Sequence, residues 1–525
     1  MIGRRRPFRA SALTAVAVVF LPGLGLGASP AGAYAPQDAA GTSTAASAGE
    51  IADLLHGQRN GAWKSTYRPL ASGPTLIRGA TIMTAAGEEI EGGDLFMRDG
   101  KIVEVGRNLD VPAGTDVIDA SGRFVTPGII DTHSHLGVSP SPSISSTSDT
   151  NESTDPNTAE VWAMHSVWPQ DPGFTRALAA GVTTLQILPG SANLIGGRGI
   201  TLKTVPGRTV QEMMFPDAPM ALKMACGENP KRVYGGRQRS PRTRMGNMAG
   251  YREAFIEAER YRRRWDAWIE GGMTGDVGDA EDAGDAEDAG DAEDVGDTGY
   301  TGDARNSKGP PVRDLAKETL AEVLRGVIFV HNHCYRADEM AQMMDLAREF
   351  GFRIRSFHHA IEAYKLRDLL ARDTVAASMW VDWWGFKLEA YDAVPQNIAL
   401  VSEAGARAIL HTDSDMGIQV MNQDAARAMY AGRAAGIDVG RDEALRWITA
   451  NPAWALGLDD RVGTLQPGKN ADLVIWSGDP FSVYSRANQV FIDGALIYDR
   501  SRSDVQPTTD FELGILPSSG QGGDR

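Results

Sequence analysis

The residues Gly128-Ile129-Ile130-Asp131-Thr132-His133-Ser134-His135 place an apolar strand directly before two histidines. In a strand, residues two apart share a face, so the imidazoles of His133 and His135 can point to one spot beyond the strand's carboxyl end. That is the spacing of two metal ligands. Taken alone, two histidines at a polar strand end can equally meet solvent or a carboxylate.

Strand-like apolar runs continue downstream of this motif and alternate with helical stretches. This alternation is typical of βαβ units around a parallel sheet. We expect strands near residues 129–133, 182–187, 200–205, 220–224, 327–333, 352–357, 374–379 and 408–413. Eight such strands predict an α/β fold of the (β/α)8 TIM barrel type, with its site at the carboxyl ends of the strands.

Short strands separated by turn residues flank the predicted barrel, between residues 75 and 118 and again between 471 and 498. A few isolated strands at either end would not be stable alone. We therefore expect them to pair into a small discontinuous β-sandwich domain built from both chain ends. The predicted domain ranges are 73–127 and 460–502 for the sandwich and 128–459 for the barrel.

The first 33 residues have the pattern of a signal peptide. Arg4-Arg5-Arg6 precedes an apolar run from Leu13 to Leu26, and Ala31-Gly32-Ala33 resembles a cleavage site. Arg5-Arg6-Pro7-Phe8 also resembles the twin-arginine form. We expect an exported protein with no membrane span in the mature chain. The rival interpretation is an uncleaved anchor. A flexible lead-in (34–72) and a disordered tail (503–525) are predicted beside the folded part.

The formal net charge of -16 is concentrated in one segment, because residues 275–303 hold twelve Asp and Glu and no Lys or Arg. Its six-residue repeat offers no apolar residues to bury, so we expect a disordered acidic insert over 272–308. The rest of the chain has no basic stripe, and a nucleic-acid partner is not expected. We expect a small-molecule substrate. The sequence does not decide whether the chain forms a homo-oligomer.

Histidines gather at the ends of the predicted strands. Seven of the nine in the chain lie there, together with Asp413: His133, His135, His331, His333, His358, His359 and His411. Scattered structural histidines would not cluster in this way, whereas a nitrogen- and oxygen-rich site for divalent metals requires it.

Lys223 lies on the predicted fourth strand, where its apolar neighbours should face the outer helices and leave the lysine pointing inward. It is an electrostatic anchor, an ion-pair partner of Glu228 or Asp413, or, if carbon dioxide carboxylates its amine, an anionic bridge between two metals. Cys226 and Cys334 are the only cysteines. They form either one disulfide, which export permits, or two buried thiols.

Two motifs, Val125-Thr126-Pro127-Gly128-Ile129-Ile130-Asp131-Thr132-His133-Ser134-His135 and Gly463-Thr464-Leu465-Gln466-Pro467-Gly468-Lys469-Asn470-Ala471-Asp472-Leu473, resemble the amidohydrolase superfamily. The nearer match is its imidazolonepropionase-like branch, from about residue 75 to 499. The resemblance implies that His133, His135 and Asp413 bind one divalent ion. It implies His333 and His359 for a second ion, with a carboxylated Lys223 bridging the two and zinc the foremost metal.

Two histidine pairs leave a choice within this pattern. His331 and His333 share a strand face, and we choose His333 as the ligand. His358 and His359 should point oppositely, and we choose His359. The residues expected to orient a ligand or to touch substrate are His331, His358, His411, Arg336 and Tyr364.

The implied reaction is hydrolysis of an amide-type carbon–nitrogen bond in a cyclic amide or a peptide-like compound. A hydroxide between two metals would attack the carbonyl, and Asp413 would pass its proton to the leaving nitrogen. The alternatives are an exported dipeptidase, a one-metal deaminase, and a metal- or solute-binding protein without turnover. Trp380, Trp383 and Trp384 could line the substrate pocket or pack in the core of their loop.

Overall fold

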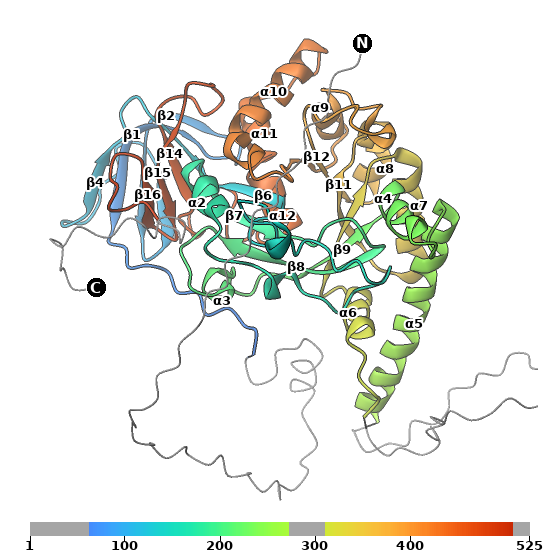
Figure 1. Cartoon of the computed structure of the whole chain (residues 1–525). Coiled ribbons are helices and arrows are strands. Elements are labelled where there is room, and N and C mark those ends of the chain that lie inside the picture. The colour runs from blue at the N-terminus through green and yellow to red at the C-terminus, as the bar shows by residue number, and fades with distance from the viewer. Residues whose placement is uncertain (1–61, 272–309, 508–525) are drawn as a thin grey trace, which may run out of the picture. The chain divides into compact units, whose positions relative to one another are not determined.

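The computed structural model describes residues 62–271 and 310–507 (Figure 1). The predicted signal peptide, the acidic insert, most of the lead-in and the tail beyond residue 507 lie outside the described residues. The strands form two eight-stranded sheets.

The first sheet combines strands from both ends of the described chain. It contains β1 (Thr75–Met83), β2 (Glu89–Arg98), β3 (Lys101–Gly106), β4 (Asp116–Asp119), β5 (Phe124–Pro127), β14 (Leu473–Trp476), β15 (Ala487–Ile492) and β16 (Ala495–Asp499). The two ends join where β5 pairs with β14 in antiparallel register, with Thr126 opposite Val474. The strands of the chain ends therefore do pair. They form one hydrogen-bonded sheet, whereas the sequence predicted a sandwich of two sheets.

The alternation of side chains along β14 explains how this sheet packs against the barrel. Leu473 and Ile475 pack into the core of the sheet's own unit. Val474 and Trp476 point to the other face and belong to the large core that the barrel shares. Because strand side chains alternate between faces, four consecutive buried residues serve two cores.

The second sheet is the barrel. It runs in chain order through β6 (Ile129–Ser134), β7 (Val182–Ile187), β8 (Ile195–Lys203), β9 (Ala221–Ala225), β10 (Phe329–Cys334), β11 (Ile354–His359), β12 (Ala376–Met379) and β13 (Ala408–Leu410). Each predicted strand has a counterpart here. The edge strands β6 and β13 are not paired directly. The backbone N–H of Asp413 nevertheless donates to the His133 carbonyl at 3.0 Å, so the sheet is nearly closed.

One strand differs from the expected parallel pattern. β8 is antiparallel to both of its neighbours, β7 and β9. The connection from β7 to β8 covers only residues 188–194, whereas a parallel crossover needs about a dozen residues or more. This short connection can only turn the chain back on itself, so the prediction of eight parallel strands is wrong at β8.

The described helices are α2 (Pro172–Ala179), α3 (Val210–Met213), α4 (Glu228–Gly236), α5 (Arg244–Glu270), α6 (Leu315–Leu324), α7 (Ala337–Phe350), α8 (Arg367–Arg372), α9 (Asn397–Glu403), α10 (Met421–Ala434), α11 (Arg441–Arg446) and α12 (Ala450–Ala455). Local signals fix their ends: Asp171 caps α2 ahead of Pro172, and α7 stops at Gly351 in left-handed conformation. Among the described helices, none has both the length and the apolar character of a membrane span.

Candidate functional site

The histidines at the strand ends meet at the carboxyl end of the barrel. They are His133 of β6, His135 just after it, His331 and His333 of β10, His358 and His359 of β11, and His411 after β13. All except His135 are at most 1% exposed. Asp413 follows β13 and joins them.

Three of the predicted ligands lie together. Nε2 of His135 is 3.1 Å from Oδ1 of Asp413, and Nε2 of His133 is 3.5 Å from the same oxygen. One donor atom from each of the three residues falls within 4.8 Å of the others, which is the arrangement of a metal site. The sequence motif therefore places His133 and His135 beside the carboxylate that the resemblance implied.

A second possible ligand group shares His133. Donor atoms of His133, His358 and His411 also lie within 4.8 Å of one another. His333 and His359, the pair predicted for a second ion, have ring centroids 4.5 Å apart. Nδ1 of His359 is 3.9 Å from Oδ2 of Asp413. The structure thus brings together more nitrogens than two ions need.

His358 orients two of its neighbours. Its Nδ1 lies 2.9 Å from Nδ1 of His133, and its Nε2 lies 2.8 Å from Nδ1 of His331. Both nitrogens of His358 are therefore engaged with other rings. The contacts leave Nε2 of His133 and of His331 as the available atoms of those two residues.

The backbone at the end of β11 explains why His358 and His359 both join the cluster. Both ring centroids lie 4.9 Å from that of His133, although neighbours on a strand should point oppositely. His359 has a φ of 67°, in the left-handed region. Asp413 has a φ of 56°. Such backbone conformations are costly for these residue types and tend to occur at functional sites.

Burial keeps the histidines neutral. Desolvation lowers the pKa of His331 and of His411 to about 3, and the nearby charge of Lys223 contributes in the same direction. It also lowers the pKa of His133, His358 and His359 well below the usual value. A neutral imidazole keeps the lone pair that a metal needs.

Unpartnered nitrogens test whether a metal fits. Nε2 of His133 and His331 and Nδ1 of His359 and His411 are buried and make no hydrogen bond within the described part of the chain. A buried polar atom without a partner costs about 1–3 kcal/mol, and a bound cation would remove that cost for each nitrogen that it contacts. Nitrogen and oxygen donors of this kind fit zinc and similar divalent ions.

His333 differs from the other ligand candidates because both of its nitrogens have neighbours. Its Nδ1 lies 2.8 Å from Oγ of Ser191, and its Nε2 lies 3.4 Å from the amide nitrogen of Asn229. Neither Ser191 nor Asn229 was predicted from the sequence. Ser191 lies in the connection between β7 and β8 and Asn229 in the first turn of α4, where residue type alone gives no signal.

Lys223 points into the barrel, as the alternation of β9 predicted. Its side chain is fully buried, its Nζ donates to the carbonyl of Pro189 at 2.8 Å, and it is in register with His331. Burial lowers the pKa of Lys223 to about 8, and the nearby Asp413 opposes the shift. A lysine in this state loses its proton far more readily than one in water.

Asp131 is a residue of the site that the sequence analysis quoted but did not assign. Its carboxylate is fully buried and accepts hydrogen bonds from the His133 N–H at 3.1 Å and from Oγ1 of Thr412 at 2.6 Å. Burial raises the pKa of Asp131 to about 7. Asp131 therefore links β6 to the segment that carries Asp413, and so positions His133 and Asp413 relative to each other.

Two of the residues expected to touch substrate are engaged elsewhere. Arg336 makes two hydrogen bonds of 2.9 Å to Asp338. The hydroxyl of Tyr364 donates to the carbonyl of Asp392 at 3.2 Å. Both contacts are exposed to solvent. A role for either residue in the site thus has no support from its contacts.

Cys226 and Cys334 form a disulfide, which decides between the two alternatives that the sequence left open. Their Cα atoms are 5.3 Å apart. The bridge joins the end of β9 to the end of β10, directly after His333. The N–H of Cys226 also donates to the His333 carbonyl at 2.9 Å. This end of the barrel is therefore cross-linked beside the histidines.

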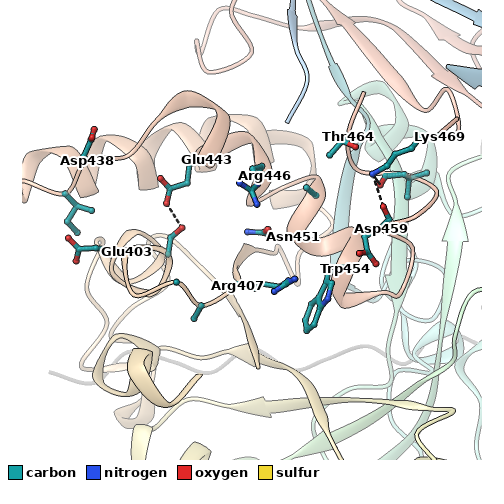
Figure 2. Close-up of a pocket in the computed structure, with 16 residues that line it drawn as sticks. Glu403, Arg407, Asp438, Glu443, Arg446, Asn451, Trp454, Asp459, Thr464 and Lys469 are labelled. Carbon is teal, nitrogen blue, oxygen red and sulfur yellow. Dashed lines mark hydrogen bonds between the residues drawn. The ribbon is translucent and has the colours of Figure 1, made fainter. Parts of the chain in front are cut away.

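A cavity of about 770 Å³ lies away from this cluster (Figure 2). It opens beside Arg407, which precedes β13, whereas His411 follows that strand, so the cavity is at the amino end of the barrel. Its labelled side chains include Arg446, Asn451 and Trp454, and the Arg407 guanidinium lies 4.1 Å from the Trp454 ring. None of the predicted ligands lines it. Its size alone does not make it the site of the chemistry.

Comparisons with known proteins identify the family of the chain. The model of the amidohydrolase family matches residues 362–498. The chain is 33% identical over 459 residues to the amidohydrolase tasK of Hapsidospora irregularis, an alignment that covers 81% of this chain and 43% of tasK. The chain thus spans less than half the length of that relative.

Two further relatives are matched over most of their length. An imidazolonepropionase of Mesorhizobium japonicum is 22% identical over 414 residues, which cover 74% of this chain and 87% of the relative. The crystal structure of an amidohydrolase from Thermotoga maritima MSB8 superposes with a TM-score of 0.69 at 34% identity, and covers 81% of this chain and 100% of its own. The chain belongs to the amidohydrolase superfamily.

Proposed function

We propose that this protein hydrolyses an amide-type carbon–nitrogen bond of a small molecule with the help of divalent metal ions, zinc foremost. The observation that carries the proposal is the convergence of His133, His135 and Asp413, whose donor atoms lie within 4.8 Å of one another. Membership of the amidohydrolase superfamily supports the reaction class. Substrates of this kind are cyclic amides and peptide-like compounds.

The first ion would be held by His133, His135 and Asp413. For the second ion we propose His333 and His359, whose ring centroids lie 4.5 Å apart. Nδ1 of His359 is buried without a hydrogen-bond partner, and Ser191 would orient the His333 ring through Nδ1, with Nε2 left for the ion. His358 would act by orienting His133 and His331.

Asp413 would carry the proton transfers. Its side chain is 20% exposed, so it is the part of the first ligand group that substrate can reach together with His135. When bound, divalent ions polarise a substrate carbonyl and make water a stronger acid. The Asp413 carboxylate would take a proton from the attacking water and deliver it to the nitrogen as the carbon–nitrogen bond breaks.

Lys223 would supply a bridging carboxylate. Its free amine would attack carbon dioxide, form a nitrogen–carbon bond and release one proton to give a carbamate. Full burial and a pKa lowered to about 8 favour the free amine that this step needs. The charge of Lys223 contributes to the lowered pKa of both His133 and His359, which supports a position near both ligand groups.

We also propose that the protein is exported. The Arg-rich start, the apolar run and the Ala31-Gly32-Ala33 motif are typical of a signal peptide. The disulfide between Cys226 and Cys334 supports an oxidising compartment. Fractionation of cells that express the whole chain, with a lysine pair in place of Arg5 and Arg6 as control, tests the twin-arginine route.

The function is tested with the purified full-length protein. Metal content is measured by mass spectrometry, and hydrolysis is assayed on cyclic amides, N-acyl amino acids and dipeptides. We expect about two divalent ions per chain and activity that a chelator removes and zinc restores. A protein that binds no divalent ion, or that hydrolyses none of these amides when loaded, would contradict the proposal.

A further inference from the structure

The loop after β12 exposes three of its aromatic side chains and buries two of its charged ones. Trp383 is 41% exposed, Trp384 62% and Phe386 55%. In contrast, the side chain of Glu389 is 2% exposed and that of Lys387 16%. This reverses the usual pattern of a surface loop, because exposed apolar area is unfavourable unless a ligand or partner covers it.

Polar contacts hold this loop in place along its length. Trp380 donates from Nε1 to the carbonyl of Thr412 at 3.0 Å. Asp382 pairs with Arg427 of α10. Lys387 donates from Nζ to Asn229 at 3.0 Å, and Glu389 accepts from the backbone N–H of Glu228 at 2.9 Å. The exposed rings are therefore presented by an anchored segment.

The rings continue directly from the metal site. The Trp380 ring stacks on the imidazole of His359, with centroids 4.2 Å apart and planes 30° apart. Trp383 stacks on Trp380 at 4.7 Å and 22°. Phe386 stands edge-on to Trp383 at 6.3 Å and 87°. Trp380, Trp383 and Phe386, here called the aromatic wall, lead from a proposed ligand to solvent.

We propose that the aromatic wall selects substrates that carry an aromatic or large apolar group next to the bond that is cut. This inference rests on the proposed function, because it assigns the scissile bond to the ions near His359. Continuity of the wall with His359 favours substrate over a second protein chain as the group that covers it. A substrate ring that stacks on Trp383 and meets Phe386 buries apolar area on both sides.

Pairs of amides that differ only in a phenyl group test the inference. The probes are 5-benzylhydantoin against 5-methylhydantoin, and N-acetyl-phenylalanine against N-acetyl-alanine. In the wild-type enzyme we expect a kcat/KM about tenfold or more higher for the phenyl member, the effect of burying one aromatic side chain. Trp383→Ala and Phe386→Ala should remove this preference by lowering kcat/KM for the phenyl member.

The control is Tyr484→Ala, which removes an aromatic side chain that is 89% exposed in the connection between β14 and β15. It should preserve the preference. The inference fails if the wild-type enzyme does not prefer the phenyl member, or if both wall variants keep the preference. It also fails if the wall variants turn a dimer into a monomer, because the wall would then be an interface.

Direct binding separates this inference from the proposed function. Calorimetry with the same four compounds on the Asp413→Asn protein measures affinity without turnover. A phenyl preference in binding that Trp383→Ala removes supports the wall even if no amide is hydrolysed, in which case only the proposed function fails. Equal affinities for both members of each pair would overturn the inference while hydrolysis could still stand.

Discussion

At the residue scale, Asp413 separates metal binding from catalysis. It contacts His133 and His135 through one oxygen and approaches His359 through the other. Asp413→Asn keeps the shape of the side chain and an oxygen that can bind a metal ion, but it removes the carboxylate that accepts the proton. We expect kcat to fall by about 10²–10⁴-fold, the range for a positioned acid or base, with metal content little changed. Mass spectrometry of the metals beside a rate assay checks this, and a variant with normal kcat would refute the role.

His331 and His333 form a matched pair for locating the second ion. Both are buried residues of β10 on one strand face, so each substitution should disturb the fold similarly. If His333 is the ligand, His333→Asn should lower metal content from about two ions to about one. His331→Asn should keep both ions. The reverse result would make His331 the ligand.

The choice between His331 and His333 also shows what the sequence could not decide. Strand periodicity placed His133 and His135 at one spot, since it depends only on backbone geometry. The same periodicity puts His331 and His333 on one face, so it cannot choose between them. We choose His333 because its ring lies beside that of His359, with centroids 4.5 Å apart, a proximity that only the folded chain supplies. Similarly, only the left-handed φ of His359 breaks the expected opposition to His358.

At the scale of elements, strand positions were predictable and strand directions were not always. Every expected barrel strand has a counterpart, because an apolar run of this length has to be buried. The direction of β8 depends on the length of the 188–194 connection, which the strand pattern does not encode. Whether Cys226 meets Cys334 depends in turn on β9 lying beside β10, a pairing that only the fold supplies.

The disulfide predicts a stability effect at the same scale. Cys226 and Cys334 are 108 residues apart in sequence, so the bridge closes a long loop in the unfolded chain. Replacing both by serine should destabilise the protein by about 2–5 kcal/mol and lower its Tm. Calorimetry of the double variant against untreated wild type, with reductant-treated wild type as a second reference, measures this. An unchanged Tm, or two titratable thiols in the untreated protein, would contradict the bridge.

At the scale of the whole molecule, a buried charge cluster joins the barrel to the sheet of the chain ends. Lys203 at the end of β8 is 1% exposed and lies 3.0 Å from carboxylates of both Asp472 and Asp493. Asp493 also accepts from the hydroxyl of Tyr67 at 2.6 Å. The sequence predicted that the chain ends would pair, but it offered no sign of this cluster, because Lys203 is 269 and 290 residues from the two aspartates.

Lys203→Met therefore tests how the two sheets are held together. The variant leaves two buried carboxylates without their cation, which should destabilise the protein by about 3–5 kcal/mol. Because burial already raises the pKa of Asp472, the protonated carboxyl is the form that the variant should favour.

Adding Asp472→Asn and Asp493→Asn to Lys203→Met should recover part of the stability lost, as measured by urea unfolding, since these changes remove the unpaired charges. Arg208→Ala breaks an ion pair whose arginine is 89% exposed and should leave the unfolding midpoint unchanged. If Lys203→Met unfolds at the wild-type midpoint, the sheets are held by apolar packing alone, and the shared core around Val474 and Trp476 becomes the contact to test.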